Sequence, residues 1–134
     1  MIPMDPKLRA VFDAAPPAPR AGMLALRQLI FDVAARLPKV GRIEEALRWG
    51  EPAYLTPETG AGSTLRLGAP RSGGFALYCN CQTSLIADFR DLAGTGARTS
   101  GNRAVLFAGL GDIDPALTAI LISRALTWHL RQRG

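Results

Sequence analysis

Residues 63–81 read STLRLGAPRSGGFALYCNC, and this stretch decides the fold class of the chain. On both sides of a Gly-rich turn at residues 70–74, apolar side chains recur at every second position, which is the period of a β-strand. A turn of this length between two such runs is typical of an antiparallel hairpin. We therefore predict strands over residues 63–68 and 75–81, which face a hydrophobic core with Leu65, Leu67, Phe75 and Leu77.

Two further strands are expected beside this hairpin. Residues 53–55 precede it across the Gly-rich loop 56–62, and residues 103–107 follow it, with Leu106 expected in the same core. Short strands separated by Gly-rich turns are the pattern of an antiparallel meander. The sequence therefore predicts a mainly antiparallel sheet.

The longest helix is predicted before the sheet, in the segment that ends at Pro38. Apolar residues recur there at steps of three and four and share one face: Met23, Leu26, Ile30, Val33 and Leu37. Arg27, Asp32 and Arg36 lie off this stripe, and the spacing of Asp32 and Arg36 allows an ion pair on the helix surface. This helix is expected to pack its apolar stripe on the sheet.

Shorter helices are predicted from their start and stop signals. Residues 5–6 are Asp-Pro, and residues 114–115 are Asp-Pro again, which suits the cap and first position of a helix. A Thr-Ser pair at residues 83–84 suits the cap of another helix. A short helix is also predicted over residues 43–49, because Gly50 would end it.

These elements predict an α+β fold, a two-layer sandwich with a mainly antiparallel sheet of about four to six strands and helices packed on it. The 134 residues suit one domain, which we expect over residues 1–134, with residues 1–19 as an N-terminal extension that contains a short helix.

The net charge of +5 and the pI near 10.0 raise the question of nucleic acid. The 16 basic residues are mostly Arg, and along the sequence they form no basic run and no Arg–aromatic repeat that would stack bases. We therefore expect no nucleic-acid partner. No apolar run suits a bilayer and the N-terminus lacks a signal-peptide pattern, so we expect a cytoplasmic protein without a membrane partner. The oligomeric state stays open.

No complete catalytic motif is present, so a non-enzymatic protein is the leading expectation and an enzyme is an open alternative. No cofactor and no metal are expected. Cys79 and Cys81 are expected on the core face of their strand, and the alternative is a reactive Cys81 beside a helix start. His129, the single His, is expected at a helix end. Glu44 and Glu45 are expected in the first turn of a short helix, where the helix dipole favours acids.

A polar pocket is predicted where polar side chains at the ends of elements approach one another. Its residues are Arg48, Glu51, Tyr78, Gln82, Asn102 and Arg103. Two Arg forks and the backbone donors of the helix start near Thr83 would favour an anion, so we expect an unknown small, anionic ligand. The alternative is that these charged residues form ion pairs that lock the loops together.

Three segments resemble the bacterial uncharacterised-domain family 1801. They are WGEP at residues 49–52 within residues 47–56, YCNCQT at residues 78–83 with Phe89 and Arg90, and GNRA at residues 101–104. The resemblance covers about residues 20–130 in order.

The resemblance implies a YdhG-like fold similar to frataxin, with helices packed on an antiparallel sheet. One branch of the broader family is regarded as an iron chaperone, whereas most members have no assigned activity. Iron binding, or a role as a protein-interaction module, is therefore the alternative to a small-ligand binder. This chain departs from the iron-binding pattern, because its first long helix carries Arg instead of a ridge of carboxylates.

Overall fold

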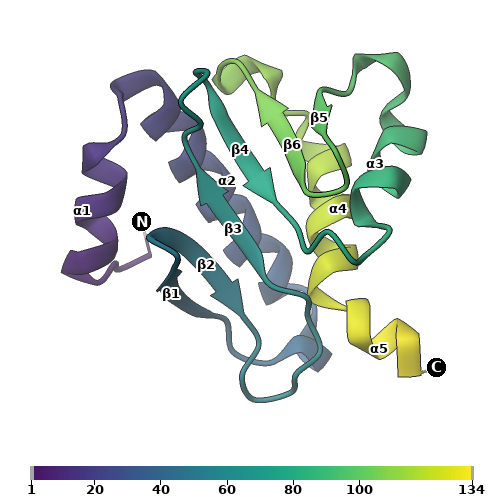
Figure 1. Cartoon of the computed structure of the whole chain (residues 1–134). Coiled ribbons are helices and arrows are strands. Elements are labelled where there is room, and N and C mark those ends of the chain that lie inside the picture. Colours follow the sequence, from purple (N-terminus) through teal and green to yellow (C-terminus); the bar gives the residue numbers. More distant parts are fainter. Residues whose placement is uncertain (1, 134) are drawn as a thin grey trace.

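Six antiparallel strands form one sheet at the centre of the molecule, which is described for residues 2–133 by a computed structural model (Figure 1). Along the sheet the order is β1-β2-β3-β4-β6-β5, and every neighbouring pair is antiparallel. The strands are β1 (Glu44–Arg48), β2 (Glu51–Leu55), β3 (Leu65–Gly68), β4 (Phe75–Tyr78), β5 (Thr99–Ser100) and β6 (Ala104–Phe107). The predicted α+β class is confirmed. Residues 1 and 134 of the predicted domain lie outside the described range.

In the view of Figure 1, α2 (Pro17–Ala35) and α4 (Pro115–Leu126) lie behind the sheet, so one face of the sheet is covered and the other is open. The other helices are α1 (Pro6–Ala14), α3 (Leu85–Ala93) and α5 (Trp128–Arg133). Three short 3₁₀ turns, η1 (Pro38–Val40), η2 (Gly94–Gly96) and η3 (Leu110–Asp112), connect elements. The predicted helix starts are confirmed for α1 and α4, where Asp5 and Asp114 accept hydrogen bonds from backbone N–H groups.

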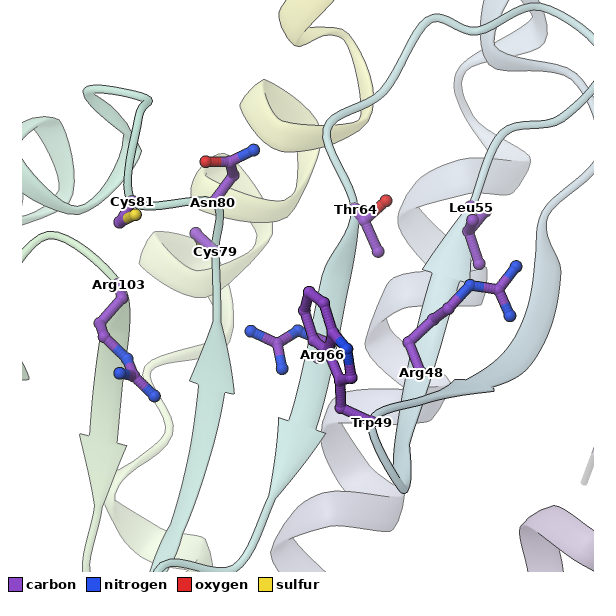
Figure 2. Close-up of a pocket in the computed structure, with 9 residues that line it drawn as sticks. All are labelled: Arg48, Trp49, Leu55, Thr64, Arg66, Cys79, Asn80, Cys81 and Arg103. Atoms are coloured by element: carbon purple, nitrogen blue, oxygen red, sulfur yellow. The ribbon is translucent and has the colours of Figure 1, made fainter.

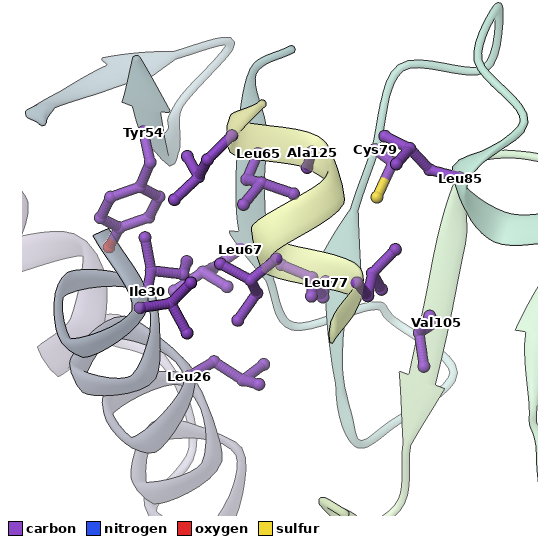
Figure 3. Close-up of a cluster of buried hydrophobic side chains, with 14 of the residues drawn as sticks. Leu26, Ile30, Tyr54, Leu65, Leu67, Leu77, Cys79, Leu85, Val105 and Ala125 are labelled. Carbon is purple, nitrogen blue, oxygen red and sulfur yellow. The ribbon is translucent and has the colours of Figure 1, made fainter. Parts of the chain in front are cut away.

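The core lies between the sheet and the pair α2 and α4 (Figure 3). As predicted, the alternating apolar residues of the central strands are fully buried: Leu65, Leu67, Phe75 and Leu77. The prediction for Leu106 is wrong, because it is only partly buried, whereas its neighbours Val105 and Phe107 pack in the core. The rings of Phe75 and Phe107 stack with centroids 5.0 Å apart.

The helix predicted over residues 43–49 is wrong. Residues 44–48 form β1, which pairs with β2 in a hairpin with a two-residue turn, so that Arg48 lies opposite Glu51. Trp49 and Gly50 make the turn with positive φ angles of 52° and 75°, the left-handed pair that such hairpins require. The prediction failed because Glu, Ala, Leu and Arg favour helices locally, while pairing with β2 decides the structure.

Arg27 was expected on the surface of the longest helix, and that expectation is wrong. Its side chain is only 1% exposed and forms a salt bridge of 2.6 Å with Glu45 of β1. The prediction that Glu45 lies in the first turn of a helix is therefore wrong. Glu45 is the salt-bridge partner of the buried Arg27. The predicted pairing of Asp32 with Arg36 is not formed either, and Asp32 accepts a hydrogen bond from Gln28 instead.

Candidate ligand-binding groove on the open face of the sheet

A row of paired residues crosses the open face of the sheet from β1 to β6. Cross-strand pairing places Ala46 beside Ala53, and Ala53 beside Arg66. The row continues to Tyr78 and then to Ala104. Because side chains alternate between the two faces of a strand, these residues point away from the helices. Two long side chains, Arg66 and Tyr78, therefore stand in the middle of this face with alanines on both sides.

A groove of about 570 Å³ runs over this face (Figure 2). Its walls come from the β1–β2 hairpin on one side and from the ends of β4 and β6 on the other. The lining residues are Arg48, Trp49, Leu55, Thr64, Arg66, Cys79, Asn80, Cys81 and Arg103. Three of them are Arg, and they come from segments far apart in the sequence.

Trp49 stands at the rim of the groove in a conformation that is unusual for a large side chain. It is the only residue other than Gly with a positive φ angle in the described part of the chain, and its side chain is 88% exposed. A left-handed backbone costs a residue with a Cβ about 1–2 kcal/mol. The Arg66 guanidinium lies 5.0 Å from the centroid of its ring, within the range of a cation–π contact.

Arg66 is held from the opposite side by Glu51. Its Nη1 lies 2.6 Å from Glu51 Oε1, and both side chains are partly exposed, at 22% and 28%. Gly68 makes room for this contact, since a Cβ at that position would lie 2.6 Å from Glu51 Oε2. Burial raises the pKa of Glu51 above its ordinary value, while the charges of Arg66 and Arg103 act in the opposite direction.

Tyr78 lies beside the groove, between two cations. The guanidinium of Arg66 is 5.5 Å from the centroid of its ring, and that of Arg103 is 5.8 Å away. Burial raises the pKa of Tyr78, and the nearby Glu51 charge raises it further. The Tyr78 phenol is therefore neutral at physiological pH. Together these contacts form a stack of planar groups that runs from Trp49 through Arg66 and Tyr78 to Arg103.

Arg48 and Arg103 line the groove with positive charges that no carboxylate of the described residues neutralises. Within residues 2–133, neither forms a salt bridge, and Arg48 donates only to the carbonyl oxygen of Leu47 at 3.0 Å. Both side chains are exposed. Since Glu51 neutralises Arg66, the groove has an excess of two positive charges at opposite walls.

The six residues predicted for the pocket divide into three groups. Arg48 and Arg103 line the groove. Glu51 and Tyr78 lie beside it, in contact with Arg66. Gln82 and Asn102 are not among the lining residues: the Gln82 N–H donates to Asn80 Oδ1, and Asn102 Oδ1 accepts from Arg90.

Sequence reasoning missed Trp49, Arg66 and Asn80. The exposed Trp-Gly pair was a signal of a hairpin turn. Arg66 could have been found from the strand period, since it alternates with Leu65 and Leu67 and must point away from the core.

The two cysteines do not share a face as predicted, because β4 ends at Tyr78. Cys79 is buried, and burial raises the pKa of its thiol to about 12, so it packs as a small apolar side chain. Cys81 is exposed at the edge of the groove. It lies in a turn before α3, three residues from the cap position Ser84, which makes no side-chain capping bond.

Glu44 and Glu45, which would be candidate ligands for a cation, lie on opposite faces of the sheet. Neighbouring residues of a strand point to opposite faces, so Glu44 and Glu45 diverge, and Glu45 is bound to Arg27. Among the residues placed by the structure, no three His, Cys, Asp or Glu side chains gather where they would hold a metal ion. His129 is exposed on α5, as expected for a helix-end residue.

Comparisons with known proteins give no relative. No protein-family model, no curated protein and no solved structure matches this chain.

Over residues 2–133, none of the helices has both the length and the apolar character of a membrane span.

Proposed function

We propose that this protein is a non-enzymatic binder of a small anionic ligand, which lies in the open-face groove between Arg48 and Arg103. The observation that carries the proposal is the pair of exposed guanidinium groups that line the groove at its two sides, neither of which has a carboxylate partner among residues 2–133. Guanidinium forks bind carboxylates and phosphates through two parallel hydrogen bonds.

The size of the groove supports a small molecule. Ligand sites for small molecules typically measure about 300–1,000 Å³, and the groove of about 570 Å³ falls within this range. The ordered stack of Trp49, Arg66 and Tyr78 gives the site a rigid wall, because each planar group is held by its neighbours. A site that is already formed loses less conformational entropy on binding.

Iron binding is the weaker proposal, since no three His, Cys, Asp or Glu side chains gather in the described part of the chain, and Glu45 and Glu51 are paired with Arg. A protein-interaction module is also weaker, because the exposed Trp49 stands alone at the rim beside charged groups and not in a broad apolar patch.

The resemblance to family 1801 is part of the proposal, and the antiparallel sheet with helices packed on one side agrees with what the resemblance implies. A cytoplasmic location is also part of it, since a reducing compartment would keep the exposed Cys81 thiol free.

A thermal-shift screen of carboxylates, phosphates, metal ions and a single-stranded oligonucleotide tests the proposal. A ligand at a hundred times its Kd stabilises the folded protein by about 2.7 kcal/mol. We expect a small anion to raise the Tm of the natural protein but not of the double variant Arg48→Ala with Arg103→Ala. A shift with ferrous iron alone would favour the iron-binding alternative, and a stronger shift with the oligonucleotide than with its mononucleotide would favour nucleic acid.

A further inference from the structure

We propose that the ligand carries a flat aromatic ring beside its acidic group, and that Trp49 stacks on this ring. The inference rests on the proposed function and specifies the chemical class of its ligand. In this arrangement Arg48, the neighbour of Trp49 in the chain, or Arg103 on the facing wall binds the acid.

The position of Trp49 is the first argument. A two-residue turn with positive φ angles favours Asn, Asp or Gly at its first position, because these residues tolerate the left-handed conformation. Trp49 takes this position although its ring, at 88% exposed, adds almost nothing to the core. Backbone strain of this kind collects at functional sites, so the residue is better explained by what it contacts outside the fold.

The surroundings of the ring are the second argument. Trp49 is the first member of a stack that continues through Arg66 and Tyr78 to Arg103, with guanidinium-to-centroid distances of 5.0, 5.5 and 5.8 Å. Aromatic rings and guanidinium groups alternate along this stack, and Figure 2 shows Trp49 beside Arg66 at its start. Arg66 occupies one side of the Trp49 ring, and the high exposure of the ring leaves the rest of its surface free.

The electrostatics of the stack also favour an aromatic anion. Glu51 fixes and neutralises Arg66, so Arg66 serves as a support for the Trp49 ring and leaves the acid to the Arg side chains without a carboxylate partner. A ring without a charge would leave these guanidinium groups unused, and an anion without a ring would leave Trp49 unused. One ligand with both features would use Trp49 and at least one of these guanidinium groups.

Matched pairs of ligands separate the ring from the charge. Naphthalene-2-carboxylate and decahydronaphthalene-2-carboxylate have the same acid and nearly the same size, but only the first has a planar π-system. Their Kd values are measured by isothermal titration calorimetry on the natural protein and on Trp49→Asn, a substitution that suits the left-handed turn and removes the ring. The Trp128→Phe variant leaves Trp49 as the single Trp, so that its fluorescence reports binding separately.

We expect the natural protein to bind the aromatic acid about tenfold more tightly than the saturated acid, as expected for one stacked ring. In Trp49→Asn the two acids should bind equally, with the saturated acid unchanged within about twofold, and the aromatic acid should quench Trp49 fluorescence with the same Kd as the calorimetry. Equal affinities in the natural protein, or an aromatic preference that survives Trp49→Asn, would overturn the inference while leaving the anion site in place. Binding of neither acid would remove the proposed site as well.

Discussion

The same three kinds of side chain, an Arg, a Glu and a Tyr, meet twice on this sheet, once on each face. We call the group on the covered face the buried cluster and the group on the open face the open cluster. Their members are Arg27, Glu45 and Tyr54 in the buried cluster, and Arg66, Glu51 and Tyr78 in the open cluster.

In the buried cluster the hydrogen-bonding groups are used within the fold. Arg27 donates to both oxygens of Glu45, at 2.6 and 2.9 Å, and to the carbonyl oxygens of Ile2 and Pro3, at 3.0 Å each. The Tyr54 hydroxyl donates to Glu45 Oε2 at 2.8 Å. The hydrogen bond with Glu45 raises the pKa of Arg27, and burial raises that of Tyr54. This cluster fastens the segment before α1 to α2 and β1.

In the open cluster one short contact, from Arg66 to Glu51, is combined with stacking, and both side chains remain partly exposed. The two clusters therefore differ in how many hydrogen-bond donors remain available to a bound ligand. A satisfied cluster in the interior holds the fold together. A partly satisfied one beside unpaired Arg side chains is arranged to bind.

The largest expected effect separates the two clusters by stability. Removing one partner of a buried salt bridge leaves an uncompensated charge and costs about 3–5 kcal/mol, so we expect a loss of this size for Arg27→Ala. The matched change Arg66→Ala should cost about 1 kcal/mol or less, because its ion pair is partly hydrated. Urea denaturation monitored by circular dichroism measures both, and equal losses would show that the two clusters serve the same purpose.

The second prediction concerns the Arg side chains that line the groove. Replacing both Arg48 and Arg103 with Ala should weaken binding of naphthalene-2-carboxylate about 100-fold, because each charged hydrogen bond contributes about 1.5 kcal/mol or more. The free energy of unfolding should change by less than about 0.5 kcal/mol, as for other exposed sites. The control Arg9→Ala with Arg36→Ala removes the same charge from two exposed sites, one in α1 and one at the C-cap of α2. If it weakens binding equally, the effect comes from net charge.

The third prediction separates stability from function at Trp49. The Trp49→Asn variant should be about 1 kcal/mol more stable than the natural protein, because Asn tolerates the left-handed conformation of the turn. Chemical denaturation of the two proteins under the same conditions measures the difference. A loss of stability would mean that the Trp49 ring supports the fold through Arg66, and the residue would then need no ligand to explain it.

The smallest expected effect is a pH dependence of the ligand affinity, which is caused by the protonation of Glu51. Its pKa is raised, chiefly by burial, so the carboxyl becomes protonated at a higher pH than an ordinary Glu and then releases Arg66. Affinity for naphthalene-2-sulfonate, whose charge is constant, should therefore rise about two- to fivefold as the pH falls from about 7 to about 4.5. Glu51→Gln should bind equally at both pH values. A pH dependence that persists in this variant would have to come from another group.

The same group has a linked effect on stability. A carboxyl with a raised pKa binds its proton more tightly in the folded state than in the unfolded state. The contribution of Glu51 to the unfolding free energy therefore falls as the pH rises from the ordinary Glu value through the raised one.

Much of the fold follows from the sequence, because the two-residue period of β3 and β4 and the caps of α1 and α4 are local signals. The β1 strand does not, since its residues favour a helix and only pairing with β2 makes them a strand. The burial of Arg27 is hidden for the same reason: its partner Glu45 lies 18 residues away on a strand that was not predicted.

The candidate site divides in the same way. Arg48 and Arg103 are at the ends of strands, where exposed functional groups are expected, and sequence reasoning selected them. Gln82 and Asn102 were selected on the same ground but do not line the groove, and Asn102 Oδ1 accepts a hydrogen bond from Arg90. Trp49 and Arg66 depend on the type of one turn and on the register of three strands, which are set by long-range pairing.

An NMR titration tests the central claim most directly, because it locates the ligand without assuming which residues bind it. Naphthalene-2-carboxylate is added to ¹⁵N-labelled protein, and the backbone and Trp side-chain N–H signals are followed. We predict saturable shifts confined to the groove, at residues 48–55, 64–66, 79–81 and 103 and at the Trp49 indole. Saturable shifts centred instead on the outer surfaces of α2 and α4, or no saturation at all, would contradict the account.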